Sequence, residues 1–150
     1  MRAARYGGPG DIQVMEVADP AVPLPGEAIL RVRLAAICGT DATEWDHGPL
    51  LARPPVTLGH EFTGEIHDLA EGSDSFVVGQ RVVSGAGVWC GECEWCRRGR
   101  TNLCARYHTI GLHVDGGLAE FVRVPTKTMV AVPDEVADEA AAIAQPIAVA

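Results

Sequence analysis

Apolar and polar residues alternate in short runs along most of the chain, and clusters of glycine, proline and aspartate separate these runs. This period of two is typical of strands, because successive side chains point to opposite faces of a sheet. The clearest run is 27–36, where one face carries apolar residues and the other carries arginines: Ala28, Leu30, Val32, Leu34 and Ala36 against Arg31 and Arg33. Further strands are predicted at 11–17, from His60 onward, at 81–83 after a turn, and at 118–124; the turn residues are Gly72, Ser73, Asp74 and Gly79. The pattern predicts a mainly β fold, a compact antiparallel β-barrel-like domain.

The end of the chain changes character and becomes rich in alanine and acidic residues. This composition predicts a C-terminal helix after Pro133, with Asp134 or Asp138 as its cap, that runs into Ala144. Pro146 interrupts it, because proline disfavours helical geometry in the residue before it. We therefore expect Gln145 at a break, with its side chain aimed out of the helical line.

Composition limits the choice of function. The chain has 150 residues, enough for one domain with a core, and we expect residues 1–150 to form a single unit. Its 12 basic and 20 acidic residues give a formal charge of −8, which argues against nucleic acid or an anionic membrane as partner. No apolar run approaches the ~20 residues that a membrane helix needs, and the N-terminus lacks a secretion signal, so a cytoplasmic protein is expected.

Four of the five cysteines fall in one short segment with the spacing Cys-x2-Cys-x2-Cys-x7-Cys: Cys90, Cys93, Cys96 and Cys104. Four thiolates around one ion form the closed tetrahedral site of structural zinc, so we predict a zinc loop over 88–105. Such a site carries a formal charge of about −2, which nearby cations would offset: Arg97, Arg98 and Arg100. Two disulfides are the alternative, but closely spaced cysteines close strained rings, and a chain without a secretion signal is not expected in an oxidising compartment.

The remaining cysteine, Cys38, ends the clearest predicted strand, and His60 and Glu61 open another. Cysteine, histidine and carboxylate are a normal ligand set for catalytic zinc, which keeps one position open. Neighbours on a strand point to opposite faces, so both His60 and Glu61 reach one ion only if the backbone bends, and Gly59 permits a bend. Otherwise Glu61 would orient the site without binding the ion directly. The amide oxygen of Gln145 is a candidate fourth contact.

Other polar residues near Cys38 have two interpretations. The hydroxyl of Thr40 is a candidate proton relay, with Asp41 or His47 farther out, but Thr40 is equally a helix N-cap for a single turn over 40–46. A lone cysteine or histidine at a strand end is also common in ordinary packing. Three further histidines have no partners in the sequence and are interpreted as surface or packing residues: His67, His108 and His113.

Taken in order, four motifs closely resemble the zinc-dependent medium-chain dehydrogenases: Cys38-Gly39-Thr40-Asp41, Gly59-His60-Glu61, the four-cysteine loop, and Asp115-Gly116-Gly117-Leu118-Ala119-Glu120-Phe121. The resemblance runs through nearly the whole chain and implies the N-terminal catalytic domain, a GroES-like β-barrel with two zinc ions. Residues 43–62 are most similar to the branch that includes 2,3-butanediol, sorbitol, threonine and glucose dehydrogenases. In that branch Cys38, His60 and Glu61 match the catalytic zinc positions, and Thr40 matches the proton-relay hydroxyl. The branch usually has glutamate where this chain has Gln145, although some glucose dehydrogenases use glutamine.

The resemblance implies NAD(P)-dependent oxidation of a small alcohol, polyol or sugar, in an enzyme that is a homo-oligomer at full length. The family binds NAD or NADP in a Rossmann domain, and the chain has no G-x-G-x-x-G, so we expect it to be inactive alone. Two alternatives remain open at this point. One is a non-enzymatic zinc-binding β-barrel scaffold, and the other is a zinc hydrolase with Glu61 as base, which thiolate ligation fits less well.

Overall fold

Strands provide most of the regular structure in residues 1–73 and 75–150, the part of the chain that this computed structural model describes. One antiparallel sheet has five strands in the order β10 (Met129–Ala131), β6 (Arg81–Ser84), β5 (Glu61–Leu69), β3 (Glu27–Ala36) and β9 (Phe121–Pro125). A second sheet has the order β2 (Asp11–Glu16), β1 (Arg2–Gly8) and β4 (Val56–Thr57), and β7 (Gly87–Val88) pairs with β8 (His108–Thr109). The mainly β, antiparallel prediction is confirmed, with the described strands in three sheets.

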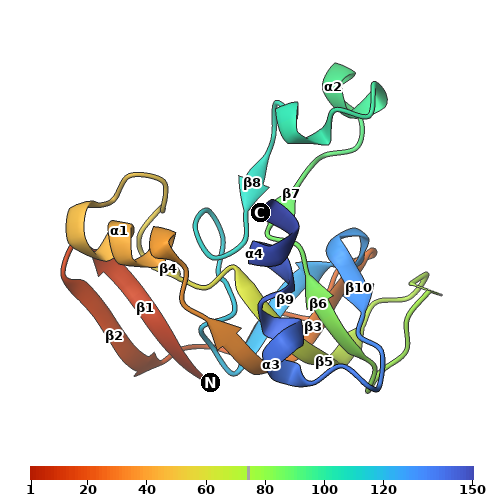
Figure 1. Ribbon diagram of the computed structural model, residues 1–150, viewed down its shortest axis with the longest axis horizontal. Helices are drawn as coiled ribbons and strands as arrows, with labels where there is room; N and C mark the ends of the chain where they lie inside the picture. Colours follow the sequence, from red (N-terminus) through yellow and green to blue (C-terminus); the bar gives the residue numbers. More distant parts are fainter. Residues whose placement is uncertain (74) are drawn as a thin grey trace.

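The helices are short and lie around the sheets (Figure 1): α1 (Gly39–His47), α2 (Glu94–Arg97), α3 (Asp138–Ala142) and α4 (Ala144–Val149), with 3-10 turns η1 (Thr101–Leu103) and η2 (Thr126–Thr128). The segment that carries α2 projects from the rest of the molecule, and α1 covers the end of the β1–β2 hairpin. Within the described residues, no helix has both the length and the apolar character needed to cross a membrane.

The buried side chains form two clusters, one for each main sheet. The larger cluster is lined by the five-stranded sheet and includes Leu30, Phe62, Ile66, Val82, Val122 and Val124. The smaller lies between β1 and the segment before β5, and includes Tyr6, Val56, Leu58 and Leu112. His60 lies two residues after Leu58 of the smaller cluster and two residues before Phe62 of the larger one. The candidate ligand is therefore held between a residue of each core.

The bounds of β3 are those predicted, but its apolar face changes along the strand. Val32 pairs with Gly64 and Leu34 pairs with Thr63, so β3 contains one extra residue, Arg33, against its partner. An extra residue shifts the alternation of faces by one. Leu34, predicted on the buried face, is 38% exposed for this reason.

Other strand predictions are correct in place and shifted at their ends. The strand expected from His60 begins at Glu61, which leaves His60 in the loop before it. The strand predicted over 118–124 is β9 at Phe121–Pro125, because the residues before it bond to other segments: the N–H of Ala4 donates to Leu118 O at 2.8 Å. Asp74, part of the predicted turn, lies outside the described residues.

Helix α1 is longer than the single turn predicted over 40–46, and its N-cap is Cys38, not Thr40. A capping box explains this start: Asp41 accepts the N–H of Cys38 at 2.9 Å, while the Cys38 side chain faces the N–H of the same aspartate. Cys38 is therefore fixed at the N-terminus of the helix, which begins at Gly39.

The C-terminal helix also differs from the prediction. It starts at Asp138, but the N-cap is Ala137, because the Asp138 carboxylate instead bonds Arg33 at 2.6 Å and Arg81 at 2.8 Å. The break falls at Ile143, before the α4 segment that contains Gln145 and Pro146. A proline ring clashes with the carbonyl four residues earlier, so the helix breaks upstream of the proline. Gln145 is therefore helical and not at the break.

Candidate metal centres

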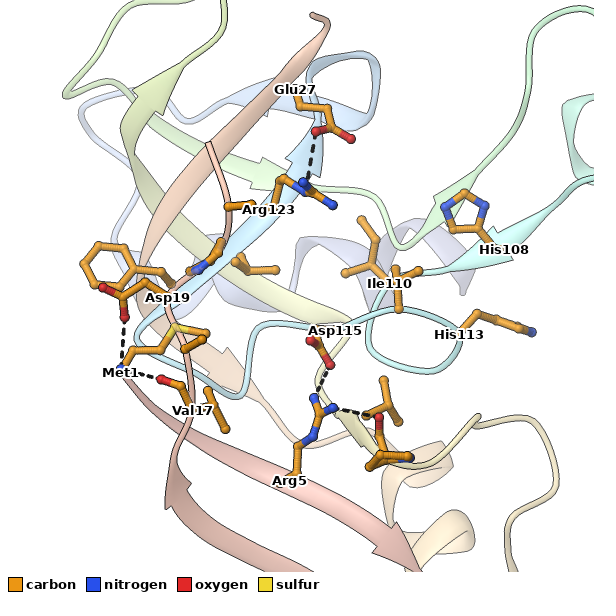
Figure 2. Close-up of a pocket in the computed structure, with 18 of the residues that line it drawn as sticks. Met1, Arg5, Val17, Asp19, Glu27, His108, Ile110, His113, Asp115 and Arg123 are labelled. Atoms are coloured by element: carbon orange, nitrogen blue, oxygen red, sulfur yellow. Dashed lines mark hydrogen bonds and ion pairs between the residues drawn. The ribbon is translucent and has the colours of Figure 1, made fainter. Parts of the chain in front are cut away.

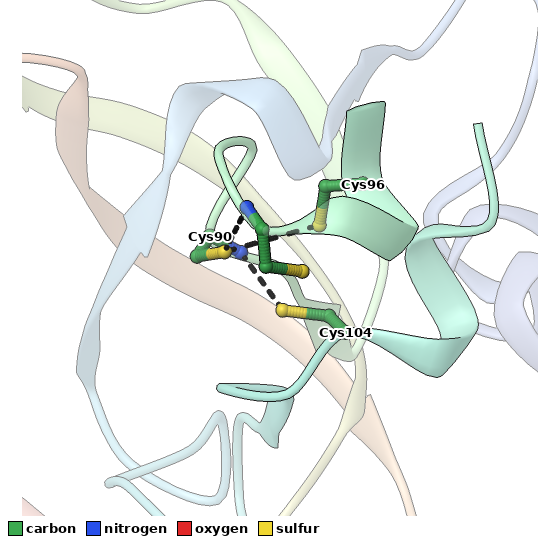
Figure 3. Close-up of side chains that lie close together, drawn as sticks. Cys90, Cys96 and Cys104 are labelled. Carbon is green, nitrogen blue, oxygen red and sulfur yellow. Dashed lines mark hydrogen bonds between the residues drawn. The ribbon is translucent and has the colours of Figure 1, made fainter. Parts of the chain in front are cut away.

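The four clustered cysteines meet at the tip of the projecting segment. One ligand atom from each of Cys90, Cys93, Cys96 and Cys104 lies within 4.8 Å of all the others. Figure 3 shows Cys90, Cys96 and Cys104 turned toward a common point, and the sulfurs of Cys90 and Cys96 are 3.9 Å apart. All four are free thiols, so the disulfide alternative is not what the structure contains. The donor set is that of a closed four-sulfur site.

Backbone N–H groups surround these sulfurs. The N–H of Cys93 donates to Cys90 Sγ at 3.4 Å, and the N–H groups of Cys90 and Arg106 donate to Cys104 Sγ at 3.3 Å. Backbone donors lower the pKa of Cys90 to about 6, whereas burial and the neighbouring thiols raise the pKa of Cys96 to about 12. At neutral pH these values give a Cys90 thiolate beside a protonated Cys96, and a dication in their midst would favour the thiolate form of both.

The arginines that were predicted to offset the charge of the four-cysteine site also make other contacts. Arg98 pairs with Glu94 at 2.7 Å, and Arg97 donates to the carbonyl of Glu92 at 2.8 Å. Arg106, which the sequence analysis did not name, donates its N–H to Cys104 Sγ, and its side chain helps to lower the pKa of Cys90. Its position two residues after Cys104 was the available signal, since that spacing keeps its amide within reach of the last thiol.

The second group forms as predicted from distant parts of the chain. One ligand atom each of Cys38, His60 and Glu61 lies within 4.8 Å of the others. Cys38 comes from the N-terminus of α1, His60 from the loop before β5, and Glu61 from its first residue. Both His60 and Glu61 are buried, and Gly59 has a φ of +96°, which is the predicted bend. The bend allows sequence neighbours to converge on one point.

Close backbone packing fixes that bend. The N–H of Gly117 donates to the carbonyl of Gly59 at 2.8 Å, and the N–H of Leu118 donates to Leu58 O at 3.0 Å. A Cβ on Gly111 would lie 2.4 Å from the Gly59 oxygen, and a Cβ on Gly116 would lie 2.2 Å from it. Because Gly111 and Gly116 lack a Cβ, the loop that contains them can press directly on the backbone that presents His60.

Asp41 links two of the three candidate ligands. One of its oxygens accepts the N–H of Cys38, and the other lies 3.7 Å from Nδ1 of His60. Burial raises the pKa of Asp41 in spite of these neighbours. The facing oxygen and Nδ1 are both buried, and neither has a hydrogen-bond partner among the described residues. Sequence reasoning gave Asp41 only a distant relay role, because the contact with His60 joins separate elements.

The remaining predicted residues are placed as follows. Thr40 Oγ1 lies 3.7 Å from Cys38 Sγ, within hydrogen-bonding range of sulfur. Gln145 is half-buried in α4, which contacts β5, the strand that begins with Glu61. His47 is exposed and pairs with Asp46 at 3.2 Å, so it points to solvent. Ligation by Gln145 stays a prediction.

A mainly β fold with a projecting four-cysteine segment and a Cys-His-Glu group places this chain among the GroES-like domains of dehydrogenases. It belongs to the family described as the alcohol dehydrogenase GroES-like domain, whose model matches residues 24–134. The resemblance drawn from the motifs is thereby confirmed.

Individual relatives agree. The chain is 41% identical over 133 residues to L-threonine 3-dehydrogenase of Chelativorans sp. (strain BNC1), covering 84% of this chain and 39% of that protein. The structure of a zinc-binding dehydrogenase from Sinorhizobium meliloti 1021 bound to NADP superposes with a TM-score of 0.90 and 36% identity, over 98% of this chain and 42% of that one. Galactitol-1-phosphate dehydrogenase from Escherichia coli gives a TM-score of 0.93 and 30% identity, over 99% and 43%. The chain thus spans less than half the length of these relatives.

Proposed function

We propose that this chain is the zinc-binding catalytic domain of an NAD(P)-dependent dehydrogenase that oxidises a small alcohol, polyol or sugar. The observation that carries the proposal is the convergence of Cys38, His60 and Glu61 from three places in the fold. Sulfur, nitrogen and carboxylate oxygen are donors that zinc accepts, and three protein ligands are the number that leaves a position for substrate. The charges of the thiolate and the carboxylate together balance the dication.

The environment of His60 fits a metal ligand. Because Nδ1 faces Asp41, the other ring nitrogen is left available to the ion, and the aspartate would hold the proton at Nδ1. An ion bound to the other nitrogen would orient the ring of His60, and this orientation would explain why Nδ1 and the facing oxygen of Asp41 are buried with no other partner in the described part of the chain. Asp41 also holds the amide of Cys38, so one carboxylate positions two ligands.

The chemistry divides between the ion and the chain. Zinc held by these residues would act as a Lewis acid toward a substrate oxygen. The chain supplies the surroundings: Thr40 lies beside Cys38 with a hydroxyl that can accept and pass on a proton, and the buried loop around Gly59 excludes water from one side of the site. NAD or NADP would be bound by another part of a longer protein, a proposal supported by the NADP-bound relative of which this chain covers 42%.

We assign a second, structural zinc to Cys90, Cys93, Cys96 and Cys104. The four-sulfur donor set has no place for substrate, and the opposite pKa shifts of Cys90 and Cys96 fit a site that a dication completes. Binding there would stabilise the projecting segment, which contains few apolar contacts of its own.

Counting zinc tests the proposal. We expect two ions per chain, one ion in His60→Ala and one in Cys93→Ser, measured by elemental analysis after dialysis. The catalytic site would be refuted if the wild-type chain bound one ion, Cys93→Ser bound none and His60→Ala still bound one. That result would favour a zinc-bound scaffold. The chain alone should show no NAD(P)-linked oxidation of 2,3-butanediol, sorbitol, threonine or glucose, and turnover would contradict the assignment of the nucleotide to another domain.

A further inference from the structure

A cavity of about 800 Å³ lies between β1, β9 and the segment around β8 (Figure 2). Its lining includes neither Cys38, His60 nor Glu61, so it is formed by a different set of residues from the candidate metal centres. Part of its exposed wall is apolar and includes Pro55 and Val114, while Val56, Val88 and Ile110 behind it belong to the buried cores. The volume is large enough for a small organic molecule.

Most charges in this cavity are already paired. The N-terminal amine contacts Asp19 at 2.9 Å, Arg5 pairs with Asp115, and Arg123 lies 3.5 Å from Glu27. Asp115 also accepts the N–H of Thr57 at 2.8 Å, so both residues of the Arg5 pair are held by the fold. These groups build the wall and leave little free charge.

Three basic side chains in the lining remain: Arg53, His108 and His113. Within the described residues, none of them forms an ion pair with a carboxylate. Figure 2 shows His108 and His113 on the same side of the cavity, with Ile110 near them and the Met1–Asp19 pair on the opposite side. They form a local cluster of one guanidinium and two imidazoles, in a chain whose net charge is −8 with its histidines neutral. The N–H of Arg53 donates to the carbonyl of Leu112 at 2.8 Å, which places Arg53 beside the neighbouring His113.

The cluster has the electrostatics of an anion site. Burial lowers the pKa of His113, and the positive charges of Arg53 and His108 lower it further. The N–H of Thr109 donates to Nδ1 of His113 at 3.0 Å, so the neutral ring carries its hydrogen on Nε2 and remains a donor. At neutral pH the cluster therefore presents the charge of Arg53 and the N–H donor of His113, and a bound anion would favour the protonated form of His113.

We propose that this cavity binds a small organic anion, with its carboxylate or phosphate on Arg53, His108 and His113 and its apolar body on Pro55 and Val114. Arginine presents a planar fork that matches both oxyanions, and the histidines add single donors. The acidic net charge of the chain opposes general attraction of anions, so binding requires this local cluster. The proposal does not rest on the metal-dependent function, because the two sites share no residue.

Calorimetry with phenyl phosphate, benzoate, inorganic phosphate and neutral phenol tests it on the 150-residue chain. We expect phenyl phosphate or benzoate to bind, phenol not to bind, and inorganic phosphate to bind more weakly than phenyl phosphate. Arg53→Gln should weaken binding by about tenfold or more, the loss expected for a hydrogen bond to a charged group. Arg2→Gln removes the same charge from an exposed residue outside the cavity lining and should leave the affinity unchanged.

A second measurement follows the histidines directly. Bound phenyl phosphate should raise the pKa of His113 in an NMR titration, because an anion reverses the effect of the neighbouring cations. Absence of binding by both phenyl phosphate and benzoate would overturn the proposal, as would equal weakening by the two arginine variants. Inorganic phosphate that binds as tightly as phenyl phosphate would overturn the role of the apolar wall.

Discussion

Replacing Gly59 with alanine should disrupt the fold at the candidate catalytic site. The residue has a φ of +96°, and an added Cβ would lie 2.6 Å from the backbone nitrogen of Leu118 and 2.8 Å from its Cγ. The backbone strain costs about 1–2 kcal/mol, and overpacking against an atom that cannot rotate away costs about 1–3 kcal/mol. We expect Gly59→Ala to lower the free energy of unfolding by about 2–5 kcal/mol, a large share of a typical domain's ~5–15 kcal/mol.

Gly79→Ala provides a matched control. Its φ of +86° carries similar strain, but no described atom lies within 4 Å of the added Cβ. Urea unfolding of the zinc-loaded proteins, extrapolated linearly to water, measures both free energies. We expect Gly79→Ala to lose only the strain, about 1–2 kcal/mol, and Gly59→Ala also to lose zinc from the second site. If the two variants were equally stable, close packing of Leu118 on Gly59 would not fix the position of His60.

Three further predictions follow from other contacts. Asp138→Ala should lower the free energy of unfolding by about 1–2 kcal/mol at pH 7, because Arg33 and Arg81 lower the pKa of Asp138 in the folded protein. The difference between variant and parent should be full above the unfolded pKa of about 3.9, and it should vanish as the pH falls through the folded pKa. In the same urea titrations, Asp134→Ala should change the free energy of unfolding little. Cys93→Ser should speed amide hydrogen exchange in residues 88–105 by about tenfold or more, and exchange as slow as in the parent would contradict a metal at this site. Glu44→Gln should lower the free energy of unfolding in urea by about 2–3 kcal/mol. The buried carboxylate accepts the N–H groups of Leu51 and Leu50 at 2.6 and 3.0 Å, and a glutamine would turn its own NH2 donor toward one of them. A loss below about 0.5 kcal/mol would show that the loop after α1 does not depend on these hydrogen bonds.

Local patterns were enough to predict β2, β3, β5, β6 and β9 and the meeting of the four cysteines, but not β1 or the short strands β4, β7, β8 and β10. The bounds of β3 follow from its period of two and its flanking breaks, and the meeting of Cys90, Cys93, Cys96 and Cys104 follows from spacing within one short segment. The membership in the dehydrogenase family followed from motif order, and the family model confirms it. Each of these signals is contained in residues that are close in sequence.

Contacts between distant segments could not be predicted in the same way. The shift of faces at Arg33 depends on its register against β5, and the position of Asp41 beside His60 depends on a loop that closes between them. The break at Ile143 was misplaced for a different reason: the prediction considered the residue before Pro146, whereas the clash acts one turn earlier. Arg53 joins His108 and His113 from a distant segment, and in the sequence these residues look like isolated surface residues.

The segment that carries the four cysteines enters and leaves the body of the molecule at one point. Val88 and His108 stand opposite each other in an antiparallel pair, and residues 89–107 extend outward from it. A short hairpin turn could therefore rejoin β7 to β8 if the whole projection were deleted, without rerouting the chain through the sheets. The appendage has the connectivity of an interchangeable module, so it could be excised, lengthened or transplanted while the path of the surrounding polypeptide stays the same.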